Sequence, residues 1–380
     1  MKQKTPKKKN NRAQWLMTLG FMSIGGVCGI LMIRYLDMTA NADRPLATEL
    51  LTFGLLILAM YAGILLQIIL HEAGHLIGGL LSGYRFSSFR IFSLMLTEEN
   101  GKLHCKRFSL AGTGGQCLMA PPTPDADGHF PFVLYNLGGS LMNLLTTIAF
   151  ILCALAVWQQ PLASTLLLML AVIGFGFALL NGLPLRLTEV DNDGRNIRSI
   201  GENPETRRAF WLQLAINEQT ARGVALQDMP DAWFSLPSAE GMKNSMCATI
   251  AVFAANRLLA QNQLTEADAL MARLLAMDSG MIGIHRSLLI CDRLTCEALG
   301  ENRAAVIDAM LTRDLQTFMK AMKTYPSILR TQYILALCHE KNEVKAKKLQ
   351  QRFEKMARTY PYPADLAADR MLMDQAATMQ

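Results

Sequence analysis

The chain has 380 residues, of which 51% are hydrophobic and 18% are charged, and its 37 Lys and Arg against 31 Asp and Glu give a formal net charge of +6. This length allows two domains. The apolar residues form long runs in the first half, and the charges are concentrated after about Arg195. Basic flanks at a cytosolic membrane surface account for the positive charge, so we expect no nucleic-acid partner.

Four of the apolar runs are long enough to span a membrane, which requires about 20 residues in a helix. A buried helical core is the alternative interpretation, but core helices rarely run this long without a charge. We therefore predict a mainly α fold, namely a polytopic membrane helical bundle with about four transmembrane helices. The runs are roughly Gln14–Ile33, Leu50–Ser82, Phe132–Trp158 and Leu162–Pro184.

Lysine and arginine residues indicate which helix ends face the cytosol. The first run follows a basic tail and ends at Ile33-Arg34-Tyr35 rather than at a small-residue cleavage site, which favours a retained anchor over a secretory signal. The loop 83–131 and the region after Pro184 are also basic, as is typical of cytosolic segments. We expect a multi-pass cell-membrane protein with both termini in the cytosol. Its predicted parts are a basic cytosolic tail (1–13), a transmembrane domain (14–200) and a cytosolic helical domain (201–380).

The second run contains the motif His71-Glu72-Ala73-Gly74-His75 near its end. On a helix, H-E-x-x-H places two imidazoles on one face with a carboxylate between them, an arrangement that holds zinc and activates a water molecule. Ionisable groups at membrane depth are costly and therefore indicate a function. The motif predicts a metalloprotease with its active site inside the bilayer, in which His71 and His75 bind zinc and Glu72 is the general base.

A catalytic zinc site needs a third protein ligand, which we expect near the cytosolic end of another apolar helix. The fourth run breaks at Asn181-Gly-Leu-Pro184, because proline cannot continue a helix without the loss of a backbone hydrogen bond. The acidic segment that follows is, by itself, also typical of an ordinary cytosolic turn. Together with H-E-x-x-H on another inward helix, it favours a carboxylate ligand, for which the candidates are Glu189, Asp191 and Asp193.

In these motifs the chain resembles the site-2 protease family of intramembrane zinc metalloproteases. Members of that family carry H-E-x-x-H on one core helix and N-x-x-P followed by D-G near another, which His71-Glu72-x-x-His75 and Asn181-x-x-Pro184…Asp193-Gly194 match in order. The segment Gly139 to Asn143 matches a G-P-x-x-N-like element of the family loosely, without its proline. The resemblance covers about residues 48–200. Asn181 and Asp193 lie further apart than is common in the family, and the match of Gly194 favours Asp193 as the ligand, with Asp191 in reserve.

The resemblance implies an enzyme that hydrolyses peptide bonds in or near transmembrane segments of membrane-anchored protein or peptide substrates, with Zn²⁺ as cofactor. It also implies that Asn181 holds the substrate backbone and that Asn143 assists. A catalytically inactive zinc-binding scaffold that recruits partners through its helical tail is the alternative, although a purely structural metal site has no need of Glu72. A metal transporter is a further candidate, which the few intramembrane ligands and the lack of a visible inverted repeat disfavour.

The loop 83–131 is too long to be a simple connector. Tyr84–Leu96 and Lys102–Leu110 alternate partially, which predicts a β-hairpin with its turn at Asn100-Gly101. The resembled family also places strands here, where they receive an extended substrate. The segment from Ala111 to Gly115 is interpreted as a flexible stretch before Pro121.

From about Glu202 the pattern becomes that of a soluble, charged helical domain, with apolar residues at three- and four-residue spacing. A weak repeat with a period of about forty residues predicts units of helix, short polar turn and helix, which suits a tetratricopeptide-like array. A non-repetitive helical bundle is the alternative. Either fold offers a surface for a protein partner or a substrate. The repeated units are Leu259-Ala-Gln-Asn262, Leu299-Gly-Glu-Asn302 and Cys338-His-Glu-Lys-Asn342, and the clearest helical segments are Thr265–Met277, Arg303–Met322 and Val344–Ala357.

Overall fold

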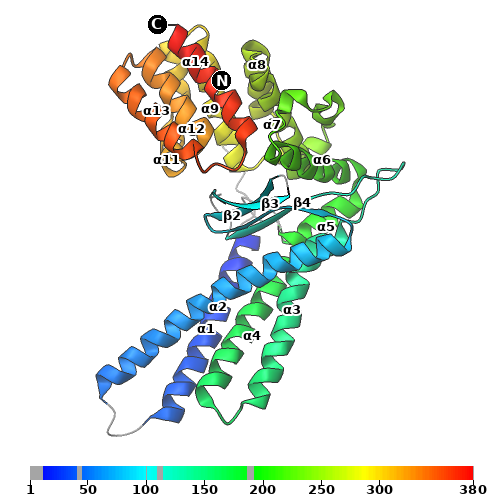
Figure 1. Ribbon diagram of the computed structural model, residues 1–380, viewed down its shortest axis with the longest axis vertical. Helices are drawn as coiled ribbons and strands as arrows, with labels where there is room; N and C mark the ends of the chain where they lie inside the picture. The colour runs from blue at the N-terminus through cyan, green and yellow to red at the C-terminus, as the bar shows by residue number, and fades with distance from the viewer. Residues whose placement is uncertain (1–11, 41–44, 100, 109–113, 186–191, 380) are drawn as a thin grey trace. The chain divides into compact units, whose positions relative to one another are not determined.

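The computed structural model describes residues 12–40, 45–99, 101–108, 114–185 and 192–379 (Figure 1). The chain forms two compact units. One comprises residues 1–84 and 131–199 and is called the bundle unit here; the other comprises residues 85–130 and 200–380 and is called the sheet–helix unit.

The bundle unit contains four long helices that lie side by side (Figure 1). Each of them is long and apolar enough to cross a membrane, which confirms the prediction of four candidate spans. Many of their leucine side chains are exposed, as expected of a surface that faces lipid rather than water. The helices are α1 (Arg12–Thr39), α2 (Leu46–Leu81), α3 (Val133–Ala156) and α4 (Pro161–Gly182), and a shorter helix, α5 (Asp193–Glu202), follows them.

Helix α2 is the longest element and carries the H-E-x-x-H motif in its final third. Its 36 residues extend over about 54 Å at 1.5 Å per residue, more than the roughly 30 Å of a bilayer's hydrocarbon core. A helix of this length that crosses a bilayer tilts, extends beyond the apolar layer, or does both. The helix ends where Gly83, with φ +82°, turns the chain and Tyr84 N–H donates to the carbonyl of Gly79 at 3.0 Å.

The sheet–helix unit contains a four-stranded antiparallel sheet with strand order β3-β2-β1-β4. Strand β2 (Leu94–Glu99) pairs with β3 (Lys102–Arg107) along its whole length, and Gly101 between them has a φ of +73°, which glycine adopts without strain. The predicted hairpin is thus confirmed, although Asn100 of its turn lies outside the described residues.

The sheet is larger than the single predicted hairpin. The expected first strand, Tyr84–Leu96, is in fact two strands, β1 (Arg85–Ile91) and β2, which are separated by a turn at Phe92 with φ +50°. The stretch from Ala111 to Gly115 that was interpreted as flexible lies mostly outside the described residues, and a fourth strand, β4 (Gly115–Ala120), begins at its end and pairs with β1. No strand was predicted for these residues, and their pairing is supplied by the open edge of β1.

The sheet shares its core with the C-terminal helices of the same unit. Met95 of β2 is fully buried in one apolar cluster with Leu294 and Phe353, and the Arg107 N–H donates to the carbonyl of Thr359 at 3.0 Å. The loop 83–131, which the sequence analysis grouped with the transmembrane domain, therefore packs with the C-terminal helices. These are α6 (Pro204–Ala221), α7 (Ser245–Ala260), α8 (Leu264–Ala276), α9 (Gly283–Leu299), α10 (Ala304–Met310), α11 (Arg313–Ala321), α12 (Pro326–Ile334), α13 (Glu343–Ala357) and α14 (Pro363–Thr378), with short turns of helix η1 (Leu226–Asp228), η2 (Asp231–Phe234), η3 (Gly241–Lys243) and η4 (Leu335–His339).

Three connections between these helices share one backbone conformation. Asn262, Asn302 and Lys341 have φ values of 57°, 50° and 52°, and each lies between two helical segments. They fall within the three repeated sequence units, so the predicted alternation of helix, polar turn and helix is present. The expected helix Arg303–Met322 is two helices instead, because Thr312 caps α11 and its Oγ1 accepts from the N–H of Leu315 at 3.3 Å.

Candidate metal centre

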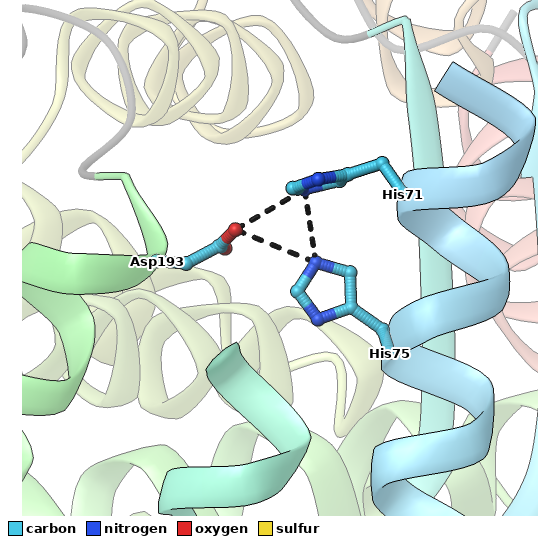
Figure 2. A group of neighbouring side chains, drawn as sticks. All are labelled: His71, His75 and Asp193. Atoms are coloured by element: carbon cyan, nitrogen blue, oxygen red, sulfur yellow. Dashed lines mark hydrogen bonds and ion pairs between the residues drawn. The ribbon is translucent and has the colours of Figure 1, made fainter. Parts of the chain in front are cut away.

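The two histidines of the motif lie on one face of α2, one turn apart, and both are buried. The spacing of four residues on a helix brings their rings together, with the ring centroids 4.7 Å apart. Their Nε2 atoms point toward Asp193, which comes from the other side of the site (Figure 2). Residues separated by more than a hundred positions in the sequence thus meet within the bundle unit.

Asp193 is the first residue of α5, and Asn192 holds this helix start against the end of α4. The Oδ1 of Asn192 accepts from the backbone N–H groups of Arg195 and Leu185 at 3.0 and 3.1 Å, and its Nδ2 donates to the carbonyls of Leu180 and Leu183 at 2.7 and 2.5 Å. The bond to Arg195 N–H is an N-cap, which asparagine favours. Because Asn192 bonds to both sides of the break, it determines where the Asp193 carboxylate lies.

Gly194 allows α5 to approach α4 this closely. A Cβ at this position would lie 2.1 Å from the carbonyl oxygen of Gly182, a distance that no side chain can occupy. The aspartate–glycine pair in the sequence therefore has two separate functions: the aspartate provides the carboxylate, and the glycine lets the backbone that carries it reach the site.

The three side chains form a triangle of possible ligand atoms. The two Nε2 atoms are 3.1 Å apart, and one Oδ of Asp193 lies 3.2 Å from His71 Nε2 and 3.4 Å from His75 Nε2. Four ligands placed tetrahedrally about 2.0–2.1 Å from a zinc ion lie about 3.3 Å from one another. The residues therefore fit three corners of a tetrahedral zinc site, and the fourth corner remains for water or a substrate.

The hydrogen bonds on the far side of each imidazole determine its tautomer. His75 Nδ1 lies 2.8 Å from the backbone carbonyl of Tyr135, and His71 Nδ1 lies 2.7 Å from Oδ1 of Asn143. Both partners are acceptors, so each Nδ1 carries the proton and each neutral imidazole presents a bare Nε2. Two nitrogen lone pairs and a carboxylate oxygen then converge with no proton between them, which favours a bound cation.

Asn143 is itself held in place by α2. Its side chain is completely buried, and its Nδ2 donates to the carbonyl and to Oε1 of Gln67 at 3.1 and 2.7 Å. Because Nδ2 must face these acceptors, Oδ1 faces His71. Sequence reasoning missed Gln67, although an uncharged polar residue one turn before His71 on the same face of an apolar helix is a usable signal.

Glycines bring α2 and α3 into backbone contact around the site. A Cβ on Gly74 would lie 2.2 Å from the carbonyl oxygen of Gly138, and one on Gly78 would lie 2.4 Å from that of Leu134. A Cβ on Gly139 would lie 2.6 Å from both Nε2 atoms of the histidines. Small residues commonly permit such close helix packing in membranes, and here they also leave room for a metal ion.

The remaining predicted residues are placed as follows. Glu72 is buried on α2 between the histidines in sequence, but it does not belong to the ligand triangle. Asn181 is half-buried, and its Nδ2 donates to the carbonyl of Phe177 within α4 at 3.1 Å. Glu189 and Asp191, the other candidate ligands, lie outside the described residues.

The carboxyl group of Asp193 is suited to bind a cation in its ionised form. Burial by itself would raise its pKa, but the attraction of a protonated His75 and the hydrogen bonds that protonated histidines donate lower the pKa overall. A metal cation held by the neutral imidazoles would supply the same positive charge. An ionised carboxylate and two neutral imidazoles are the donor set of a catalytic zinc site.

Comparisons of this chain with models of protein families, with curated proteins and with solved structures find no match. The arguments about function below therefore depend on the chemistry of the site.

Proposed function

We propose that the protein is an intramembrane zinc metalloendopeptidase that hydrolyses peptide bonds in or near transmembrane segments of membrane-anchored substrates. The observation that carries this proposal is the triangle of His71 Nε2, His75 Nε2 and Asp193 Oδ, whose sides of 3.1, 3.2 and 3.4 Å fit a tetrahedral ion. His71 and His75 lie on α2, which is apolar enough to cross a membrane. Asp193 begins α5, which follows another helix of this kind, α4.

Each residue has a distinct role in this proposal. His71, His75 and Asp193 would hold the zinc ion, which when bound polarises the scissile carbonyl and makes water more acidic. Glu72 would take the proton of the attacking water and deliver it to the leaving amine nitrogen. Asn143 would hold His71 in the tautomer that the ion requires, because its Oδ1 accepts the Nδ1 proton. In the same proposal Asn181 binds the substrate backbone.

The surroundings define the class of substrate. A bilayer around the four apolar helices would exclude soluble proteins from the site, so the substrate would be a membrane-anchored protein or peptide. A transmembrane helix hides its peptide bonds, so the substrate would unwind locally before cleavage. Four crossings would place both chain ends on the same side of the membrane, and the basic N-terminal tail supports the cytosol as that side.

The C-terminal helices would bind a protein partner or present the substrate. Their helix–turn–helix pairs, with the shared turns at Asn262, Asn302 and Lys341, support a tetratricopeptide-like arrangement as the proposed basis of this function. The sheet–helix unit would then act as the recognition part of the protein.

The metal site is tested by zinc analysis of the purified full-length protein in detergent. We expect the wild type and Glu72→Gln to retain about one zinc per chain, and His71→Ala and Asp193→Asn to lose it. His104→Ala is the matched control, because His104 is an exposed histidine of β3 outside the cluster. Full zinc content in Asp193→Asn would contradict the assigned ligand, and Asp191→Asn would then be the next variant to analyse.

The activity is tested by membrane proteomics of cells that contain either the wild type or Glu72→Gln. Fragments of membrane proteins that disappear in Glu72→Gln would reveal the substrates and support the general base. Zinc-loaded wild type that produces no such fragments would instead favour the inactive scaffold. The two experiments separate the metal site from the reaction.

A further inference from the structure

The sheet–helix unit contains a cavity of about 540 Å³. Its walls come from the sheet and from helices α6, α7, α9, α12 and α14, all within this one unit. This volume is in the range of small-molecule binding sites. Because the cavity has walls on several sides, it suits a compact molecule rather than a long peptide.

The lining of this cavity has more negative than positive groups. Asp292, Asp365 and Asp369 line it together with a single arginine, Arg330. Arg330 is 3% exposed, forms a close ion pair with Asp292 and lies 3.1 Å from Asp369. The one guanidinium thus pairs with two of the three carboxyl groups, and Asp365 has no cation of its own among the charged groups that line the cavity.

The pKa values of two of these carboxyl groups reflect this imbalance. Burial and the neighbouring charge of Asp369 raise the pKa of Asp365 to about 7, although a hydrogen bond with Tyr360 lowers it. Burial and the charge of Asp292 raise the pKa of Asp369 to about 6, although Arg330 lowers it. Burial is the largest cause of both shifts, so the ionised form of each carboxyl group is only partly compensated where it lies. A bound cation would provide that compensation.

Polar atoms of the lining are also left without protein partners. Arg330 Nε, Asn256 Oδ1 and His285 Nδ1 are buried, and none of them forms a hydrogen bond with any residue that the structure describes. Buried polar atoms of this kind require an explanation. A donor on Arg330 and an acceptor on Asn256 suit a ligand that has both hydrogen-bond acceptors and donors.

Aromatic rings complete the site beside Asp365. Phe108, Tyr360 and Tyr362 line the cavity and pack edge to face, with ring centroids 5.7 to 5.9 Å apart. Aromatic faces together with carboxylates are the combination that recognises organic ammonium and guanidinium groups.

We propose that this cavity is a binding site for a small organic cation that carries ammonium or guanidinium groups and a hydrogen-bond acceptor. The cationic group binds between Asp365, Asp369 and the aromatic rings, and the acceptor receives the Nε proton of Arg330. This site is independent of the proposed peptidase, since none of the metal-site residues lines it.

The test is calorimetric titration of the full-length protein in detergent at neutral pH. The probes are L-lysinamide, which has two ammonium groups and an amide carbonyl, L-norleucinamide, which lacks the side-chain ammonium, and the neutral N-acetyl-norleucinamide. We expect one L-lysinamide site per chain, roughly tenfold or more weaker binding of L-norleucinamide, and no binding of the neutral amide, because a hydrogen bond to a charged group has that magnitude. No heat with L-lysinamide at millimolar concentration, or equal binding of all three probes, overturns the proposal.

Two variants locate the site. Asp365→Asn should weaken L-lysinamide binding roughly tenfold or more, and Ala368→Leu should weaken it by filling the cavity that Ala368 lines. Asp374→Asn is the matched control, because Asp374 is an exposed residue of the same helix that does not line the cavity. Thermal unfolding identifies any variant that fails to fold, and zinc content should be unchanged in all three. Wild-type affinity in both folded cavity variants, or equal weakening in Asp374→Asn, refutes the assignment.

Discussion

Replacing Gly139 with alanine places a methyl group beside both histidines of the metal site. Its carbon would lie 2.5 Å from His71 Cε1 and 2.6 Å from the Nε2 atoms of His71 and His75. Nonbonded heavy atoms require about 3.5 Å, so the rings or α3 would have to move by roughly 1 Å. The displaced nitrogens are the atoms that would hold the metal ion.

The magnitude follows from the cost of overpacking. Inserting a methyl group into a packed site costs about 1–3 kcal/mol. If the ligand geometry takes this strain, the affinity for zinc falls by roughly 5- to 150-fold. Cleavage should fall further, because a displacement of about 1 Å at a reacting centre costs on the order of a hundredfold in rate.

The assay is competition for zinc between a chelator and purified Gly139→Ala, with thermal unfolding measured in parallel. Gly54→Ala is the control, since Gly54 lies on α2, the helix that carries both histidines, and its added Cβ would meet no atom within 4 Å. If Gly139→Ala binds zinc as tightly as the wild type, or if Gly54→Ala is equally weakened, then Gly139 does not preserve space for the ion.

Three other predictions test the supports of the two sites. Asn143→Ala should reduce zinc affinity roughly 10- to 100-fold, because His71 loses its Nδ1 acceptor; unchanged affinity in the chelator competition would show that the bond is dispensable. Asn192→Ala removes the four hydrogen bonds that hold the start of α5 and should lower the free energy of unfolding by about 1–3 kcal/mol, measured by denaturant unfolding; a folded variant with wild-type stability would contradict this role. The pKa of Asp365 is raised from 3.8 to about 7, so the folded protein holds a proton that the unfolded chain releases. Stability should therefore fall as the pH rises from about 4 to about 7, and Asp365→Asn should reduce this slope in thermal unfolding, whereas an identical slope in the variant would be evidence against the raised pKa.

The four long helices could be predicted because an uninterrupted run of about 20 apolar residues is what a membrane-spanning helix requires. Their bounds could not: α1 continues beyond Ile33 through Arg34 to Thr39, since a charged residue ends an apolar run without ending a helix. Strand β4 was missed because its pairing with β1 depends on a neighbour that local sequence does not show.

The site was predictable in part. The spacing of His71 and His75 places both rings on one helix face whatever surrounds them. The role of Asn143 was not accessible in this way: the resemblance implied contact with substrate, and the structure shows its Oδ1 beside His71 Nδ1 and its Nδ2 bonded to Gln67. The substrate contacts of Asn143 and Asn181 stay predictions.

The amino-acid sequence by itself determined the features that depend on near neighbours: the apolar helices, the two histidines one turn apart, and the break at Pro184 that stops α4. Only the tertiary structure decided which carboxylate faces those histidines and which amide holds His71 in its tautomer. Those pairs are separated by 122 positions for Asp193 and 72 for Asn143. Their meeting depends on backbone contacts at Gly74, Gly138 and Gly194, where the absence of a side chain lets segments far apart in the chain touch.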